Sequence, residues 1–181
     1  ATLKVVGAFL GLSRERSDQR RFPAIHPLDS WSKYEGIIDS KKVAEARHIL
    51  ANGVDVNNMM KVVGEEGTSI DDFVIYLKSE YLDAVYLQQN SFDLIEANCT
   101  TLRQRYVTDK LVYVLGSNYA AESKDDARSF FNRMRQKFID WNYTEFESES
   151  FKKAESEIDI LYTKGGGKLS APAEKLLKDG E

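Results

Sequence analysis

The chain has 181 residues, a length sufficient for one domain of ordinary size with a substantial hydrophobic core. Apolar residues make up 42% and charged residues 30%, a balance typical of globular proteins that excludes a disordered or a membrane-spanning chain. The formal net charge of -4 excludes a general attraction to nucleic acid or to anionic lipid.

The cysteine and histidine content limits the chemistry further. Cys99 is the only cysteine, which excludes an internal disulfide and indicates a reducing cytoplasm. His26 and His48 are too few and too far apart for a metal cluster. The chain begins without Met or a signal peptide and opens into an apolar stretch, so we expect it to be part of a larger protein.

The first forty residues alternate between apolar and basic segments. The apolar positions of residues 2–12 wrap around most of a helix, which predicts a buried helix. Arg14, Arg16, Arg20 and Arg21 follow, and we interpret this basic cluster as a solvated face, with a nucleic-acid contact as the alternative. Residues 22–30 contain two of the three prolines, which predicts an extended or irregular segment.

Helical periodicity dominates from about residue 40 onward. One helix is predicted up to Asn52-Gly53, and a second, capped by Asp55, up to Gly64. Ser69 and Asp72 have the spacing of a capping box at the start of the clearest helix. Its apolar stripe recurs in steps of three and four, at Ile70, Phe73, Val74, Leu77, Tyr81, Ala84 and Val85.

Three more helices complete the prediction. They run from about Leu102 to Leu115, from Asp125 to Trp141, and from Phe151 to Leu161. We therefore expect a mainly α protein built as an antiparallel helical bundle, without internal repeats. The glycines at 165–167 are then expected to release a frayed, lysine-rich tail.

The sequence contains no catalytic motif of its own. Gly165-Gly166-Gly167-Lys168 fails the phosphate-loop pattern, because Tyr162 stands at the first glycine position and Leu169 replaces the required Ser or Thr. No nucleophile with a neighbouring base is recognisable. The carboxylates of residues 145–157 are interpreted as a solvated acidic face. We thus expect no catalytic residue and no metal site in this chain.

Three segments resemble the catalytic A subunit of V-type and A-type rotary ATPases. The first is Thr2 to Leu12 followed by Arg20-Arg21-Phe22-Pro23-Ala24-Ile25, the second is residues 60–64, and the third is Tyr86-Leu87-Gln88-Gln89-Asn90-Ser91-Phe92. The family usually has a histidine between the double arginine and the phenylalanine, and residues 26–30 look more like the F-type beta subunit. The resemblance fades after about residue 120, and a helical interaction module without a nucleotide role is the alternative.

The resemblance implies a domain organisation and two sites. Residues 1–34 would be the last helix and strand of a nucleotide-binding α/β domain, 35–164 a C-terminal helical bundle, and 165–181 a flexible tail. An adenine pocket is implied at Phe22, Pro23, Tyr86, Gln88 and Phe92. A loop that faces the rotor is implied in residues 64–72, with its acidic groups at Glu65, Glu66, Asp71 and Asp72.

The resemblance also implies the parent complex and its ligands. It would use ATP or ADP with magnesium, and would couple ATP hydrolysis or synthesis to proton or sodium transport. The expected partners are B subunits of a hexameric head and the central-stalk rotor subunits, with no nucleic acid and no direct insertion into the membrane. The complex would be peripheral and cytoplasmic. Because the phosphate-binding groups belong upstream, the isolated chain is expected to be inactive and to hold no cofactor.

Overall fold

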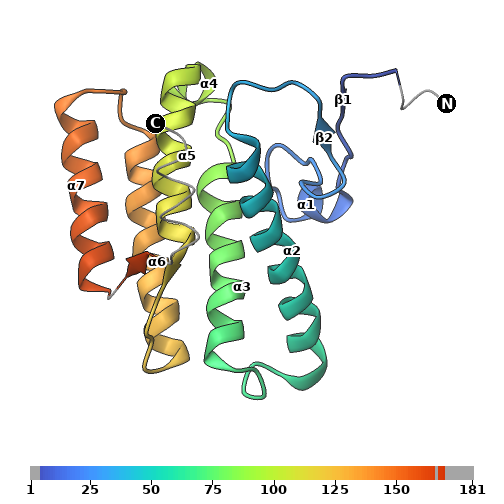
Figure 1. Ribbon diagram of the computed structural model, residues 1–181, viewed down its shortest axis with the longest axis vertical. Helices are drawn as coiled ribbons and strands as arrows, with labels where there is room; N and C mark the ends of the chain where they lie inside the picture. Colours follow the sequence, from blue (N-terminus) through green and yellow to red (C-terminus); the bar gives the residue numbers. More distant parts are fainter. Residues whose placement is uncertain (1–4, 166, 170–181) are drawn as a thin grey trace.

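Five long α-helices make up most of the described part of the chain, residues 5–165 and 167–169 of the computed structural model. They lie side by side and run up and down in alternation (Figure 1). The helices are α2 (Ser40–Val63), α3 (Ile70–Leu82), α5 (Thr101–Leu115), α6 (Lys124–Asn142) and α7 (Glu149–Lys164). The mainly α fold predicted from the sequence is thereby confirmed.

Each long helix begins at a side chain that caps it. The oxygens of Asp39, Ser69, Thr100, Ser123 and Ser148 accept hydrogen bonds from backbone N–H groups of the first turn. Such caps satisfy donors that a helix start leaves unpaired. The cap predicted at Ser69 is confirmed, since its Oγ accepts from the Asp72 N–H at 3.1 Å, while the Asp72 carboxylate accepts from the Ser69 hydroxyl rather than from its backbone N–H.

The hydrophobic core lies where α3, α6 and α7 meet α5. The α3 stripe is buried at Phe73, Val74, Leu77 and Tyr81, as its spacing predicts. Aromatic rings join the helices across this core: Tyr81 meets Phe138 edge-on at 5.7 Å between centroids. Trp141 of α6 packs on Phe151 of α7 at 4.7 Å. Burial of these large rings is the main force holding the bundle together.

Helix α3 continues into a π-helical turn, η2 (Asp83–Leu87), rather than ending. The N–H of Gln88 donates to the Asp83 carbonyl five residues earlier, at 2.8 Å. A π-turn accommodates one more residue than an α-turn and occurs often at functional sites. The chain then passes through the short helix α4 (Leu94–Ala97) before α5 begins.

Helix α2 corrects one prediction. It runs without a break through Asn52-Gly53, so Asp55 caps nothing and lies inside the helix. Glycine suits position 53 because α3 passes close by: a Cβ there would lie 2.1 Å from the Ser79 Cβ. The end predicted at Gly64 is confirmed, where a φ of +79° suits glycine.

The N-terminal segment, residues 5–32, corrects another prediction. The part of the predicted helix 2–12 that the structure describes is extended, with β1 (Ala8–Phe9) paired antiparallel to β2 (Trp31–Ser32). Residues 1–4 lie outside the described residues. The segment folds back on itself, because Gly11 accepts from the His26 N–H at 2.7 Å and donates to the Ser30 Oγ at 3.0 Å. These non-local partners replace the hydrogen bonds of a helix.

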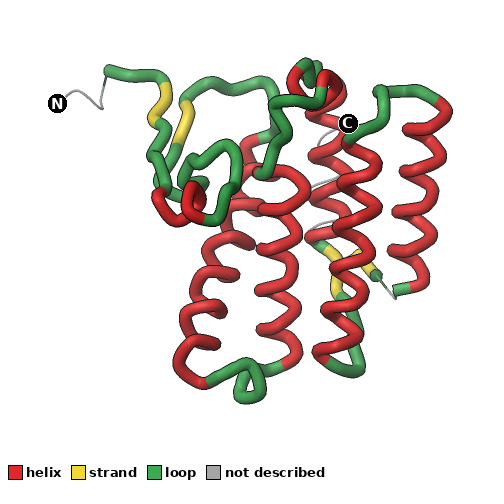
Figure 2. The backbone as a smooth tube through the Cα atoms, turned by 180° about the vertical axis from the view of Figure 1, so that it is seen from behind, coloured by secondary structure: helices red, strands yellow, loops and turns green. Residues whose placement is uncertain are grey.

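The N-terminal segment packs beside one end of α2 (Figure 2). It contains one short helix, α1 (Arg14–Asp18). The Arg47 guanidinium of α2 holds it by donating to the carbonyls of Pro27, Leu28 and Ser30 at 2.6 to 2.9 Å. Segment and bundle are thus joined by charge-assisted hydrogen bonds, which are stronger than neutral ones.

Near the C-terminus, β4 (Lys168–Leu169) pairs antiparallel with β3 (Ser117–Asn118). The predicted tail therefore includes two residues with a regular backbone partner, and residues 170–181 lie outside the described part. In the acidic stretch, Glu155 accepts from Tyr106 and Lys110, and Glu157 pairs with Lys137 at 2.6 Å. These two carboxylates tie α7 to α5 and α6, whereas Glu145, Glu147 and Glu149 are exposed as predicted.

Candidate functional site

A groove of about 560 Å³ lies where the N-terminal segment, the turn after η2 and the end of α6 meet. Two aromatic residues line it with exposed side chains: Phe22 is about half exposed, at 51%, and Phe92 is almost fully exposed, at 96%. Two exposed rings that gather at one groove form the kind of apolar surface that often marks a binding site. The lining residues come from three parts of the chain: Phe22, Ala84, Val85, Gln88, Gln89, Asn90, Ser91, Phe92, Glu96, Ile139, Asn142 and Tyr143.

The polar groups of the groove suit the hydrogen-bonding edge of a planar ligand rather than a charged group. None of its lining residues is a lysine or an arginine, as far as the described residues show. The amide side chains of Gln88, Gln89, Asn90 and Asn142 offer both donors and acceptors. Flat rings combined with amides suit a planar heteroaromatic ligand, whereas a phosphate needs cations or a nest of backbone N–H groups.

Glu96 is the one carboxylate in this lining. Burial raises the pKa of its carboxyl above the ordinary value, while the hydrogen bond from the Asn90 backbone N–H acts in the opposite direction. That N–H lies 2.5 Å from Glu96 Oε2. Glu96 thereby fixes the turn of residues 88–92 that carries Phe92.

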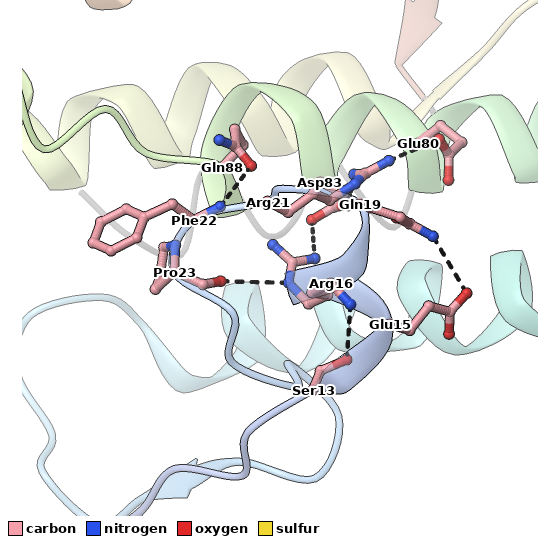
Figure 3. A network of polar contacts seen from close by, with 10 residues as sticks. All are labelled: Ser13, Glu15, Arg16, Gln19, Arg21, Phe22, Pro23, Glu80, Asp83 and Gln88. Carbon is pink, nitrogen blue, oxygen red and sulfur yellow. Dashed lines mark hydrogen bonds and ion pairs between the residues drawn. The ribbon is translucent and has the colours of Figure 1, made fainter.

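Phe22 is held through its backbone. Its N–H donates to Gln88 Oε1 at 3.0 Å, and its carbonyl accepts from the Gln89 N–H at 2.7 Å. Figure 3 shows the ring pointing away from the polar network that surrounds the backbone. The Phe22–Pro23 peptide bond is cis. Two consecutive glutamines of the bundle therefore fix the position of Phe22.

Two arginines of the basic cluster next to Phe22 correct the prediction of a solvated face. The Arg16 and Arg21 guanidinium groups both pair with the Asp83 carboxylate, and Arg21 also reaches Glu80 at 3.4 Å (Figure 3). The side chains of Arg16 and Asp83 are only 11% and 13% exposed. Burial lowers the pKa of Arg16 from its ordinary value. Arg14 and Arg20, in contrast, are exposed as predicted.

The structure brings together some of the residues predicted for an adenine pocket but not all. Phe22, Gln88 and Phe92 line the same groove. Pro23 and Tyr86 are not among its lining residues. Tyr86 lines an adjoining cavity of about 180 Å³, and its hydroxyl lies 2.9 Å from Thr108 Oγ1 on α5. Tyr86 thus backs the turn that carries Gln88 and lies outside the groove.

Sequence reasoning missed the contribution of α6. Ile139, Asn142 and Tyr143 form the third side of the groove. Asn142 is buried and donates to the Val85 carbonyl at 2.7 Å. The only local signal was a polar residue directly after the apolar stripe of α6, at Asn142, which by itself identifies no partner more than fifty residues away.

The four acidic residues predicted to face a rotor lie at the opposite end of the bundle, around the α2–α3 loop (Figure 1). Glu66 and Asp71 are exposed. Glu65 pairs with Arg128 of α6 at 2.6 Å, and Asp72 accepts from Ser69 Oγ at 2.7 Å. Lys124 of α6 also donates to the Glu66 carbonyl, at 3.3 Å. The first turns of α6 therefore brace this loop.

Two negative observations concern the described residues alone. Within residues 5–165 and 167–169, no three His, Cys, Asp or Glu side chains gather closely enough to hold a metal ion. In that same part of the chain, every helix is too short or too polar to cross a membrane.

Comparison with known proteins identifies the family. The sequence model of the C-terminal domain of V and A type ATP synthase matches residues 40–127. The V-type ATP synthase alpha chain of Treponema denticola is 52% identical over 178 residues, which are 98% of this chain and 30% of that protein. Alpha chain 1 of Treponema pallidum is 51% identical over 181 residues, and the alpha chain of Borrelia turicatae is 56% identical over 161 residues.

The chain covers 31% of the Treponema pallidum protein and 28% of the Borrelia turicatae protein, so it spans less than a third of each of these relatives. The alternative of a helical module unrelated to rotary ATPases is rejected by these identities. The chain belongs to the family of V-type ATP synthase alpha chains, the A subunits, and carries their C-terminal helical domain.

Proposed function

We propose that this chain provides the base-binding side of the nucleotide site in the subunit that hydrolyses or synthesises ATP. In this proposal the adenine ring enters the groove between Phe22 and Phe92. The observation that carries it is the convergence of two exposed rings, from segments seventy residues apart, on one groove without lysine or arginine. Gln88 and the neighbouring amides would read the polar edge of the base. Pro23 and Tyr86 would support these residues from outside the groove.

The chemistry of the groove agrees with a nucleotide site in which this chain binds only the base. Aromatic stacking contributes about 0.5 to 1.5 kcal/mol per ring pair beyond the burial of area. Association alone costs about 4 kcal/mol or more, so stacking on two rings does not yield tight binding. The phosphates and magnesium would therefore be held by the remainder of a longer protein, and we propose that this chain alone binds ATP only weakly and is inactive.

The Phe22 side chain offers the direct test. In the assembled complex, Phe22→Ala is expected to raise the KM for ATP about tenfold, because loss of stacking and burial corresponds to about 1.4 kcal/mol. The kcat should change less than twofold, and Phe22→Trp should stay near the wild-type KM. Tyr34→Ala, which removes an exposed aromatic side chain outside the groove, is the matched control. A wild-type KM in Phe22→Ala would refute the proposal.

We also propose that the α2–α3 loop contacts a rotating central stalk. Its exposed acids Glu66 and Asp71 lie at the tip of a helical hairpin, and Arg128 and Lys124 of α6 hold the loop against the bundle. A braced loop with a charged tip transmits force without forming a permanent apolar contact. The same complex would include B subunits and would transport protons or sodium ions while peripheral to a membrane in the cytoplasm.

Crosslinking in the assembled complex tests the loop proposal. Cys99 is the only cysteine of these 181 residues, so Glu66→Cys in a Cys99→Ser background, with the other cysteines of the complex replaced, places a single thiol at the loop tip. A short bifunctional reagent should join it to a central-stalk subunit. Asp140→Cys, on the exposed side of α6, is the control and should not reach the stalk. Crosslinks from position 66 to head subunits alone would contradict a rotor contact.

A further inference from the structure

Phe22 lacks the anchoring that holds a core aromatic residue. Its side chain is half exposed, so the position of the ring depends on the backbone that carries it. The backbone N–H and carbonyl of Phe22 are both used, at 3.0 Å to Gln88 Oε1 and at 2.7 Å from the Gln89 N–H. Whatever fixes Gln88, Gln89 and the neighbours of Phe22 therefore fixes the ring.

The backbone of Asp83 fixes the position of Gln88 and Gln89. Its carbonyl accepts from the Gln88 N–H at 2.8 Å and closes the π-turn η2. Compared with an α-turn, this extra residue rotates the chain that follows. Gln88 and Gln89 leave the helix at the place where they meet Phe22. The Asp83 backbone thus sets one side of the groove.

The side chain of Asp83 fixes the neighbours of Phe22. One carboxylate oxygen of Asp83 pairs with Arg16 and the other with Arg21 (Figure 3). Arg21 directly precedes Phe22. The Arg16 Nε also donates to the carbonyl of Pro23, which directly follows Phe22, at 3.5 Å. Asp83 therefore holds the chain on both sides of Phe22.

We propose that Asp83 is a positioning residue for Phe22. Its backbone holds the turn at Gln88 and Gln89, and its side chain holds the segment that carries Phe22; these are the two walls of the groove. This inference rests on the proposed function of the groove. Asp83 is not among the residues that line the groove, so it would act on the base only through Phe22. Two guanidinium groups converge on its carboxylate, with Glu80 as a more distant and half-exposed second acceptor for Arg21 alone.

Removal of the Asp83 charge is expected to separate the two walls of the groove. In Asp83→Asn, two largely buried guanidinium groups face each other without a carboxylate between them, a costly arrangement. The N-terminal segment relieves it by moving Arg16 and Arg21 into water. Because Phe22 lies between Arg21 and Pro23, its ring leaves the groove with them.

A double-mutant cycle in the assembled complex tests this positioning role. Asp83→Asn is expected to raise the KM for ATP about tenfold with little change in kcat. In a Phe22→Ala background the same change should add less than twofold, because the ring on which it acts is gone. Asp83→Glu keeps both acceptor oxygens and should stay within about threefold of the wild-type KM. Glu157→Gln, which breaks an ion pair between α6 and α7, is the matched control and should keep the wild-type KM.

The outcomes separate this inference from the proposed function. A wild-type KM in Phe22→Ala refutes the adenine site itself. A raised KM in Phe22→Ala, with either no effect of Asp83→Asn or a full effect of it in the Phe22→Ala background, refutes the positioning role alone. If Asp83→Asn does not assemble, Arg21→Lys takes its place in the cycle. It keeps one charge but loses the fork of donors, and its expected threefold rise must likewise vanish without Phe22.

Discussion

At the scale of single residues, arginines and lysines make contacts that their sequence positions do not reveal. Arg47 holds three carbonyls of the N-terminal segment, and Arg16 and Arg21 meet at Asp83. A run of basic residues most often faces solvent, which is why the sequence favoured a solvated cluster. The deciding partner, Asp83, lies more than sixty residues away, and periodicity carries no information about such a distance.

Lys78 of α3 is a second such residue, and it predicts a pH dependence of stability. Its ammonium group is largely buried and donates to the Ser117 carbonyl at 2.6 Å. Burial lowers the pKa of Lys78 from 10.5 to about 8, against a smaller opposing effect of Glu45. The unfolded chain keeps this proton up to its higher pKa, so it binds more protons than the folded chain between these values. Stability must therefore rise with pH through this window.

The contribution from Lys78 should raise the free energy of unfolding by about 2 kcal/mol between about pH 7 and about pH 9.5. Urea denaturation of the wild type and of Lys78→Met measures it, and the variant should lack this rise. The exposed Lys61→Met is the control for loss of a lysine. If the free energy of unfolding rose equally with pH in the wild type and in Lys78→Met, Lys78 could not be the source of the rise. The window ends below the ordinary tyrosine pKa of about 10, above which the raised pKa of Tyr106 and Tyr113, about 12 in both, would make stability fall again.

At the scale of elements, the apolar stripes predicted the long helices, and packing decided where local signals conflicted. The stripe of α3 and the Ser69 cap are present as expected, because both depend on residues within one or two turns. Asn52-Gly53 predicted a helix end, yet α2 continues, because Gly53 is needed where α3 crosses. Residues 5–12 pair with residues 25–33 instead of forming a helix, which no local pattern indicates.

The close crossing of α2 and α3 predicts that Gly53→Ala lowers stability and that Ser79→Gly restores it. A Cβ in Gly53→Ala would meet the Ser79 Cβ at 2.1 Å, so the helices must separate. The free energy of unfolding should fall by about 1 to 3 kcal/mol. In Gly53→Ala/Ser79→Gly the colliding atoms are absent, and most of this loss should be recovered relative to Ser79→Gly alone. Urea denaturation of the four proteins checks it, and an unaltered stability in Gly53→Ala would show that the crossing tolerates a methyl group.

At the scale of the whole molecule, the groove exists only because three distant parts of the chain meet. The resemblance to rotary ATPase A subunits indicated two of them, at Phe22 and at residues 88–92, and these do lie together. The third, at Ile139, Asn142 and Tyr143, follows from the packing of α6 against η2 and could not be read from sequence. Tyr86 was expected in the groove, but the π-turn directs it toward Thr108.

The most direct measurement is photolabelling of the assembled complex with a 2-azido-adenine nucleotide, followed by peptide mass spectrometry. The reactive group sits on the base itself and reports on what surrounds it. We expect adducts within residues 19–26, 88–96 or 139–143, and their suppression by excess ATP. ATP-sensitive labelling confined to other segments, with these three unmodified, would contradict the binding of adenine between Phe22 and Phe92.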